Sequence, residues 1–353
     1  MTIQPLVNVL VTGGCGFIGS NFIRHLYRTH PNYRIYNFDV LTYAGNPENL
    51  ADIEALENGR NEAERRYVFI KGDVADRELV RVLFEEHAFT YVFHFAAETH
   101  VDRSYSNLVD FIRTNVDGTI MLATMVMKFG GRMVHISTDE VYGSIPEEVG
   151  FVDEDAAFRP SNPYASSKAA ADMLLQSFMR TYKAPINIVR ATNNYGCFQY
   201  PEKLLPLGIT NLLEGKQIPI HGAGTHLRQW IHVEDFARAI DLVSTRADVG
   251  EIYNVAGEHA SNLEALAIIA NYLGKDLEDN KYHTPDRPGA DFRYAIDSSK
   301  LERELGWKRQ HEFRTSILTV VDWYTANRPW WEKIRMKKEF TDNYKKQSQA
   351  KYN

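Results

Sequence analysis

The sequence has few cysteines, no long apolar runs and no excess of positive charge, and each of these absences argues against a class of protein. Two cysteines, Cys15 and Cys197, cannot build a disulfide framework and favour a reducing cytoplasm. No apolar stretch approaches the roughly 18–20 residues that span a bilayer, and no signal peptide precedes the first apolar run. We therefore expect a cytoplasmic protein with no membrane partner. The net charge of −6 argues against nucleic acid as a partner.

A metal site is not expected either. The twelve histidines show no paired ligand spacing on a common helix or strand face, so the sequence predicts no metal. Hydrophobic residues make up 44% of the 353 positions and charged residues 24%, as in ordinary globular proteins. The chain is long enough to build a substantial core in one large domain or in two lobes.

Apolar runs alternate with helix-length segments through the first half of the chain. This pattern predicts an α/β fold with a doubly wound parallel sheet of the Rossmann type, because each crossover between parallel strands needs a covering helix. The expected strands lie at 7–12, 34–38, 67–71, 91–95, 133–137 and 187–190. The expected helices lie at 18–29, 77–86, 108–129 and 164–182.

The pattern loosens after about residue 195. Short strands at 218–221 and 252–255 are mixed with helices at 204–214, 234–245, 262–273, 298–305 and 314–327. We interpret 1–195 as a dinucleotide-binding domain and 196–333 as a smaller α/β substrate lobe with segments that return to the first domain. The polar, lysine-rich tail at 334–353 is expected to be a surface helix or a frayed end.

Three glycines follow the first predicted strand and precede the first predicted helix. Gly13, Gly16 and Gly19 have the spacing of a dinucleotide-binding turn, in which the backbone approaches a pyrophosphate at a helix N-terminus. Glycine turns of this kind are common between strands and helices, so the triplet alone is weak evidence for dinucleotide binding. Asp39 ends the second strand, where a carboxylate would accept from ribose hydroxyls and repel a 2′-phosphate, which favours NAD over NADP. Alternatively, the Asp39 carboxylate only caps a loop.

The spacing Tyr-x-x-x-Lys occurs twice, so it means little alone. Tyr67 and Lys71 lie in a predicted strand, where about 13 Å separates them and they cannot cooperate. Tyr164 and Lys168 lie near the start of a predicted helix, one turn apart on one face. There an ammonium could lower the pKa of the phenol and make it a base for a sugar hydroxyl. The alternative is an aromatic–cation pair on a helix surface.

Asp139 and Glu140 leave the end of a predicted strand directly after Ser137 and Thr138. In open parallel sheets, chemistry collects beyond the carboxyl ends of the strands. An elimination reaction needs one carboxyl group as acid and one as base, close together and with different pKa values. The alternative is a solvated loop pair without a chemical role.

These segments together resemble the extended short-chain dehydrogenase/reductases and, within them, the family of dTDP-glucose 4,6-dehydratases. The resemblance runs from about residue 7 to 307. It is carried by the stretches at 12–19, 39–45, 72–74, 95–104, 137–143, 163–168, 193–196, 201–204, 233–235, 286–291 and 294–297. Two departures, Cys197–Phe198 and Gln229, adjoin the expected diphosphate or base and leave open whether thymidine or uridine diphosphate is preferred.

The resemblance implies a reaction and the residues for it. A dTDP-glucose would be oxidised at C4, lose water across C5 and C6, and be reduced at C6 to dTDP-4-keto-6-deoxyglucose. Tyr164, assisted by Lys168 and Thr138, would take the proton of the C4 hydroxyl. Glu140 would remove the C5 proton, and Asp139 would donate a proton to the departing C6 hydroxyl.

The resemblance also implies two sets of binding residues. Those expected to contact NAD are Gly13, Gly16, Phe17, Ile18, Gly19, Asp39, Thr42, Asp73, Val74, Ala96, Ala97, Thr114, Tyr164, Lys168 and Asn194. Those expected to hold the nucleotide sugar are Thr99, Thr138, Asn193, Lys203, Leu204, Pro219, His221, Arg228, Asn262, Asp286 and Arg287. Guanidinium groups bind phosphates bidentately, so Arg228 and Arg287 would clamp the diphosphate; otherwise each is a surface salt bridge.

Other functions remain as alternatives. A dehydratase of UDP-glucose or another nucleotide hexose would use the same residues. A nucleotide-sugar epimerase or decarboxylase is disfavoured by the Asp139–Glu140 pair, and a non-catalytic nucleotide sensor by the retained glycine turn, Tyr164 and Lys168. Relatives pair two helices per subunit into a four-helix interface, so the segments 108–129 and 164–182 predict a homodimer.

Overall fold

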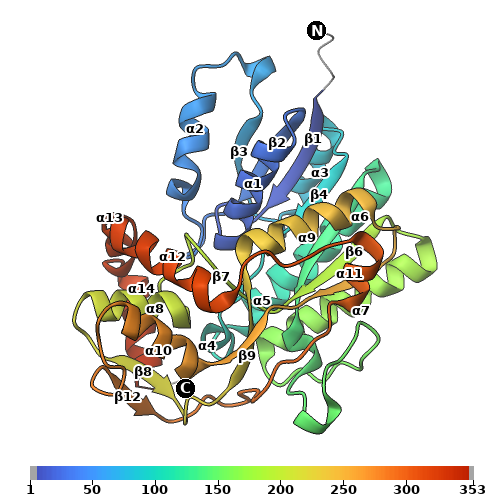
Figure 1. Ribbon diagram of the computed structural model, residues 1–353. Coiled ribbons are helices and arrows are strands. Elements are labelled where there is room, and N and C mark those ends of the chain that lie inside the picture. The colour runs from blue at the N-terminus through green and yellow to red at the C-terminus, as the bar shows by residue number, and fades with distance from the viewer. Residues whose placement is uncertain (1–5, 350–353) are drawn as a thin grey trace.

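The computed structural model describes residues 6–349 and contains a seven-stranded parallel sheet (Figure 1). Its strand order is β10-β6-β5-β4-β1-β2-β3, the doubly wound arrangement that the sequence predicts. The strands are β1 (Val7–Thr12), β2 (Tyr33–Asp39), β3 (Tyr67–Lys71), β4 (Tyr91–His94), β5 (Arg132–Thr138), β6 (Ile186–Ala191) and β10 (Ile252–Val255).

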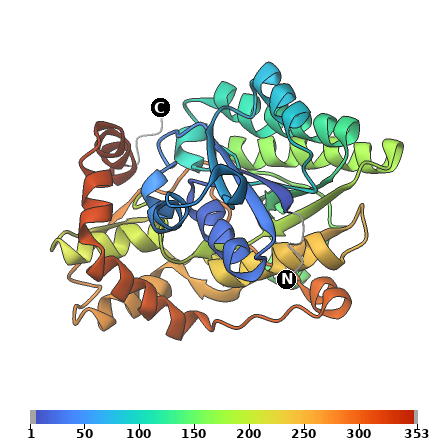
Figure 2. The same cartoon turned by 90° about the horizontal axis from the view of Figure 1, so that it is seen from above.

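Helices cover both faces of this sheet, and each face has its own apolar core. In Figure 2 the teal and green helices lie on one side of the sheet and the yellow and orange ones on the other. One core lies under α1 (Phe17–Thr29), α9 (Val233–Arg246) and α11 (Ser299–Leu305). The other lies under α3 (Arg77–Glu86), α6 (Thr119–Phe129) and α7 (Pro163–Tyr182). The central strands are rich in apolar residues because both of their faces are buried.

A second lobe packs beside the sheet, at the lower left of Figure 1. It contains the small sheets β11-β9-β7 and β12-β8 and a third apolar core. Its strands are β7 (Asn193–Tyr195), β8 (Ile218–His221), β9 (Leu227–His232), β11 (Glu258–Ser261) and β12 (Lys281–Thr284). Its helices are α8 (Leu204–Leu213), α10 (Asn262–Tyr272), α12 (Phe313–Ala326), α13 (Arg328–Arg335) and α14 (Lys338–Ser348).

The prediction of one continuous helix at 108–129 is wrong in detail, because a π-helical turn interrupts it. The segment consists of α5 (Leu108–Ile112), a π-helical turn (Arg113–Gly118) and α6. Gly118 packs so closely against Val74 that a Cβ would lie 2.6 Å from its side chain. Two further short helices, α2 (Ala51–Glu57) and α4 (Val101–Ser104), had not been expected. π-Helical turns often occur at functional sites, and this one lies beside the cavity described below.

The last described part of the chain, up to residue 349, is helical and partly buried, and the rest of the predicted tail, 350–353, lies outside the described residues. Trp330 and Trp331 of α13 lie in the core of the second lobe, and so does Phe340 of α14. The expectation of a surface helix or frayed end is therefore only partly correct, since α14 contributes an apolar side chain to that core. Within residues 6–349, no helix combines the length and apolar composition needed to cross a membrane.

Asp172 of α7 and Arg190 of β6 form an ion pair within the first lobe. Their side chains are almost fully buried, and Arg190 Nε donates to Asp172 Oδ2 at 2.9 Å. We predict that Asp172→Leu lowers the free energy of unfolding by about 3–5 kcal/mol, because it leaves a buried guanidinium without its counter-ion. Urea unfolding followed by circular dichroism measures the change.

The matched control for this prediction is the double variant Asp172→Leu with Arg190→Met. It removes both charges and should recover most of the lost stability. A single variant that unfolds at the same urea concentration as the unmodified protein would contradict the prediction.

Candidate active site

The turn between β1 and α1 is tight because its glycines carry no side chain. Gly13 has φ +69°, and a Cβ there would lie 2.6 Å from the backbone nitrogen of Ala96. A Cβ on Gly19 would lie 2.4 Å from the Gly13 carbonyl oxygen. The turn leads directly into α1, which begins at Phe17 without a side-chain cap. Free N–H groups at such a helix end can bind a pyrophosphate.

Asp39, at the end of β2, holds this turn in place. Its carboxylate accepts hydrogen bonds from the backbone nitrogens of Cys15 at 2.9 Å and Leu41 at 2.8 Å. Burial raises the pKa of Asp39, and the two N–H groups oppose that shift. Asp39 therefore does cap a loop, and its remaining lone pairs are available to a ligand in the cavity that it also lines.

Strand β5 carries two carboxyl groups to the carboxyl edge of the sheet. A short 3-10 turn, Asp139–Tyr142, follows Thr138 at once. Thr138 Oγ1 accepts from the Glu140 backbone nitrogen at 3.2 Å and donates to Asp139 Oδ1 at 3.2 Å. Asp139 is 3% exposed, so the interpretation of Asp139 and Glu140 as a solvated loop pair is wrong.

Asp139 and Glu140 have unequal surroundings. Burial and the neighbouring Glu140 raise the pKa of Asp139 well above its ordinary value. Burial also raises the pKa of Glu140, but a hydrogen bond from Asn162 and the positive charges of Arg228 and Lys203 oppose the shift. These surroundings favour a protonated Asp139 beside an ionised Glu140, which places an acid next to a base.

Helix α7 brings Tyr164 and Lys168 to the same region, one turn apart. Burial and the charge of Glu140 raise the pKa of Tyr164, and a hydrogen bond with Thr138 opposes the shift. Lys168 Nζ donates to the Ile136 carbonyl oxygen at 2.7 Å, and burial lowers the pKa of Lys168 to about 8. The Tyr164 pKa is thus raised rather than lowered as expected, because burial and nearby carboxylates dominate around the phenol.

The glycine turn, Asp39, the two carboxyl groups and the Tyr164–Lys168 pair lie on the wall of one cavity of about 510 Å³. The residues predicted to contact a dinucleotide all line it: Gly13, Gly16, Phe17, Ile18, Gly19, Asp39, Thr42, Asp73, Val74, Ala96, Ala97, Thr114, Tyr164, Lys168 and Asn194. Thr138, Asp139 and Glu140 line it as well. The fold therefore brings together side chains that are up to 181 positions apart, from Gly13 to Asn194.

The wall of this cavity is suited to a polar ligand such as a dinucleotide. Several buried side-chain oxygens on it have no hydrogen-bond partner: those of Ser137, Asn193 and Asn194, and one oxygen of Asp139. Buried polar atoms are normally paired, so these oxygens indicate positions for ligand donors. The glycine turn adds backbone N–H groups for phosphates, and Asp39 adds a carboxylate for ribose hydroxyls.

The residues predicted to hold a nucleotide sugar divide into two groups. Thr99, Thr138, Asn193 and Lys203 line the cavity. The others lie beyond its wall in the second lobe: Leu204, Pro219, His221, Arg228, Asn262, Asp286 and Arg287. The two groups therefore come from both lobes, as a substrate bound between them would require.

The two arginines expected to bind a diphosphate are held by protein groups. Arg228 donates to the Asp291 carbonyl oxygen at 2.8 Å, and its guanidinium lies 4.3 Å from the centre of the Tyr294 ring. Arg287 Nε lies 3.1 Å from Oδ1 of the buried Asp102. Neither contact is a surface salt bridge, and a phosphate would compete with these partners.

Sequence reasoning missed several residues of the cavity wall, including Tyr43, Glu98, Gln199 and Glu202. Tyr43, Glu98 and Glu202 belong to stretches that carry the family resemblance, so that signal could have indicated them. Gln199 has no such signal. It is positioned by tertiary structure, through a hydrogen bond from Nε2 to the Asn194 carbonyl oxygen at 2.9 Å.

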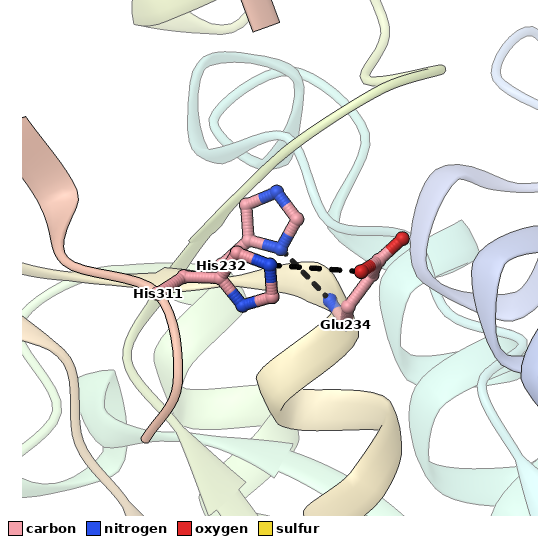
Figure 3. A group of neighbouring side chains, drawn as sticks. All are labelled: His232, Glu234 and His311. Atoms are coloured by element: carbon pink, nitrogen blue, oxygen red, sulfur yellow. Dashed lines mark hydrogen bonds and ion pairs between the residues drawn. The ribbon is translucent and has the colours of Figure 1, made fainter. Parts of the chain in front are cut away.

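A separate group of potential metal ligands consists of His232, Glu234 and His311, none of which lines this cavity (Figure 3). His232 Nδ1 accepts from the Glu234 backbone nitrogen at 3.3 Å, which leaves the proton of the neutral ring on Nε2. The His232 and His311 rings stack with their centres 4.0 Å apart. A stacked ring with a protonated free nitrogen does not offer a lone pair to a shared ion, so the geometry does not fit a metal site.

Comparisons with known proteins agree with this geometry. A sequence model of the family described as GDP-mannose 4,6 dehydratase matches residues 10–319. The dTDP-glucose 4,6-dehydratase of Streptomyces niveus is 44% identical over 341 residues, which cover 95% of this chain and 98% of that protein.

Solved structures are similar as well. The dTDP-glucose 4,6-dehydratase of Streptomyces venezuelae, crystallised with NAD, is 42% identical, with a TM-score of 0.86 and coverage of 93% of this chain and 100% of that one. The UDP-glucose 4-epimerase of Thermotoga maritima is 26% identical, with a TM-score of 0.81 and coverage of 91% and 99%. The chain therefore belongs to the GDP-mannose 4,6-dehydratase family, within the extended short-chain dehydrogenase/reductases that its motifs resemble.

Proposed function

We propose that this protein is an NAD-dependent 4,6-dehydratase that converts dTDP-glucose to dTDP-4-keto-6-deoxyglucose. The observation that carries the proposal is the pair of the buried Asp139 and the partly buried Glu140, which shares a cavity with Tyr164 and the glycine turn. Relatives named dTDP-glucose 4,6-dehydratase, from Streptomyces niveus and Escherichia coli, are 44% and 40% identical over 95% and 93% of the chain, which supports it.

The cavity wall supplies the groups that NAD requires. The glycine turn and the N-terminus of α1 would hold the pyrophosphate, Asp39 the adenosine ribose, and Lys168 the nicotinamide ribose. NAD would supply the reversible hydride chemistry by which C4 is oxidised and C6 is later reduced. The protein's own residues would perform the proton transfers.

Tyr164 would accept the proton of the C4 hydroxyl. Burial and nearby carboxylates raise the pKa of Tyr164 and so favour the protonated phenol; the role as base requires the ionised form, which the hydrogen bond with Thr138 favours. Oxidation at C4 leaves a ketone, which makes the neighbouring C5 proton acidic. The ionised Glu140 would remove this proton.

The C6 hydroxyl must leave as water, so it needs a proton at the moment its bond to carbon breaks. Asp139 would donate that proton, because burial and the adjacent Glu140 favour its protonated form. Glu140 would then return a proton to C5 as C6 is reduced. An epimerase has no leaving hydroxyl and does not need this second carboxyl group.

The second lobe would bind the nucleotide diphosphate. Arg228 would turn from its hydrogen bond to Asp291, and Arg287 from its ion pair with Asp102, toward the phosphates, since guanidinium groups favour bidentate phosphate contacts. Thymidine is our choice of base because the relatives cited above are named for dTDP-glucose. A cytoplasmic location is part of the proposal and agrees with the free Cys15 and Cys197.

The decisive test of the proposed function is the fate of a deuterium label at C4 of dTDP-glucose. We predict that the label appears at C6 of a 4-keto-6-deoxy sugar with no net consumption of NAD, as measured by NMR and mass spectrometry of the product. UDP-glucose and UDP-N-acetylglucosamine, assayed at equal concentrations, test the choice of nucleotide and hexose. An epimerised product that keeps its C6 oxygen, or no product at all, would overturn the proposal.

The variants Asp139→Asn and Glu140→Gln test the division between acid and base. Asp139→Asn should lower kcat by about 10²–10⁴-fold and accumulate the 4-keto sugar that has not lost water, because the leaving hydroxyl lacks its acid. Glu140→Gln should abolish incorporation of solvent deuterium at C5. Rapid quenching and mass spectrometry measure both effects, and full turnover by either variant would contradict the assigned role.

A homodimer through α5, α6 and α7 is the last part of the proposal. Large apolar side chains on α5 and α7 are exposed, among them Val109 at 76% and Met173 at 62%. We predict that Val109→Glu dissociates the dimer in sedimentation-velocity experiments, because it places a charge in an apolar interface. Leu56→Glu, at an exposed position of α2, is the matched control and should leave the dimer intact. A monomeric unmodified protein would contradict the proposal.

A further inference from the structure

Asn162 connects the start of the catalytic helix to the carboxylate of Glu140. Its side-chain oxygen accepts from the Ala165 backbone nitrogen at 2.9 Å and caps α7. Its side-chain nitrogen donates to Glu140 Oε2 at 3.2 Å. Asn162 is 6% exposed, so little water is available to replace either bond. A single amide therefore serves both the helix that carries Tyr164 and the proposed C5 base.

The backbone around Asn162 is held from both sides. The Asn162 carbonyl oxygen accepts from the Ser166 backbone nitrogen at 3.0 Å within the first turn of α7. The preceding residue, Ser161, donates through Oγ to Asp291 Oδ2 at 2.7 Å, in a loop of the second lobe. With its backbone fixed in this way, the Asn162 amide has a defined direction toward Glu140.

We propose that Asn162 is a positioning residue for the dehydration, which holds the Glu140 carboxylate in place relative to Tyr164 through its side-chain N–H group. This inference rests on the proposed function, because it assigns Glu140 as the base. Arg228 and Lys203 act on Glu140 through their charges, whereas Asn162 makes a directed hydrogen bond. A directed bond constrains the position of a carboxylate more closely than a charge at a distance does.

The two functions of the amide can be separated by substitution. Serine and aspartate cap helices about as well as asparagine, because each offers a side-chain oxygen to the helix N–H groups. Serine is too short to reach the same two partners, and an ionised aspartate has no N–H to donate. Asn162→Ser and Asn162→Asp therefore preserve the cap and remove the bond to Glu140.

The pH dependence of kcat reports this bond. Removing the N–H donor raises the pKa of Glu140. Because the ionised form of Glu140 is the active one, the acidic limb of the kcat–pH profile should move to higher pH. The other charged or titratable groups whose electrostatics are coupled to Glu140 are not substituted in these variants. They are Asp139, Tyr164, Lys203, Arg228, Asp291 and Tyr294.

We predict that Asn162→Ser shifts the acidic limb of kcat upward by about one pH unit, as the loss of a hydrogen bond to a charged group implies. Asn162→Asp should shift it further, because it adds a second negative charge. The KM for dTDP-glucose should change less than kcat does. Asp76→Ala, which removes the cap of α3, is the control and should leave the limb in place.

Each outcome is informative about a different claim. An upward shift in Asn162→Ser or Asn162→Asp, absent in Asp76→Ala, would support the inference. Asn162→Ser could be active with an acidic limb at the same pH as in the unmodified enzyme, whether kcat is unchanged or lowered equally at all pH values. That result would overturn the inference and leave the dehydratase proposal standing. If Asn162→Ser does not fold, Asn162→Asp provides the same test. An unmodified enzyme that does not dehydrate dTDP-glucose would overturn the proposed function and this inference with it.

Discussion

The adjacency of the buried Asp139 and the partly buried Glu140 at the end of β5 is the constraint on which the rest of the site depends. Two adjacent carboxyl groups with little access to water resist double ionisation, and their neighbours decide which one keeps a proton. Asn162, Arg228 and Lys203 favour an ionised Glu140, whereas burial and Glu140 itself favour a protonated Asp139. Acid and base character in this pair therefore arises from position, since the two side chains carry the same functional group.

Helix α7 links this pair to the core of the first lobe. Tyr164, Lys168 and Asp172 follow one another at intervals of one helical turn on its buried face. Lys168 Nζ bonds to β5 through the Ile136 carbonyl oxygen, and Asp172 pairs with Arg190 of β6. The helix that presents the phenol is thus bound to the sheet at successive turns, which keeps Tyr164 in register with the carboxyl groups at the end of β5.

Two positions that depart from the family pattern have structural functions in this chain. Gln229 accepts from the Ile296 backbone nitrogen at 2.8 Å and donates to its carbonyl oxygen at 3.1 Å, so its amide joins β9 to a neighbouring loop. Phe198 has φ +68°, and its ring packs against Trp323 and Trp330. Both residues contribute to the second lobe, and neither lines the cavity.

The sequence alone was sufficient for the parallel sheet and the glycine turn, because apolar periodicity and local spacing encode them. Most cavity residues near the strand ends were indicated by the family resemblance. The sequence alone did not determine the π-helical turn at Arg113–Gly118 or the close approach of Gly118 to Val74. Nor did it determine the raised pKa values of Asp139 and Tyr164, or the bond from Asn162 to Glu140. These features depend on burial and on contacts between segments distant in the chain, which only the tertiary structure brings together.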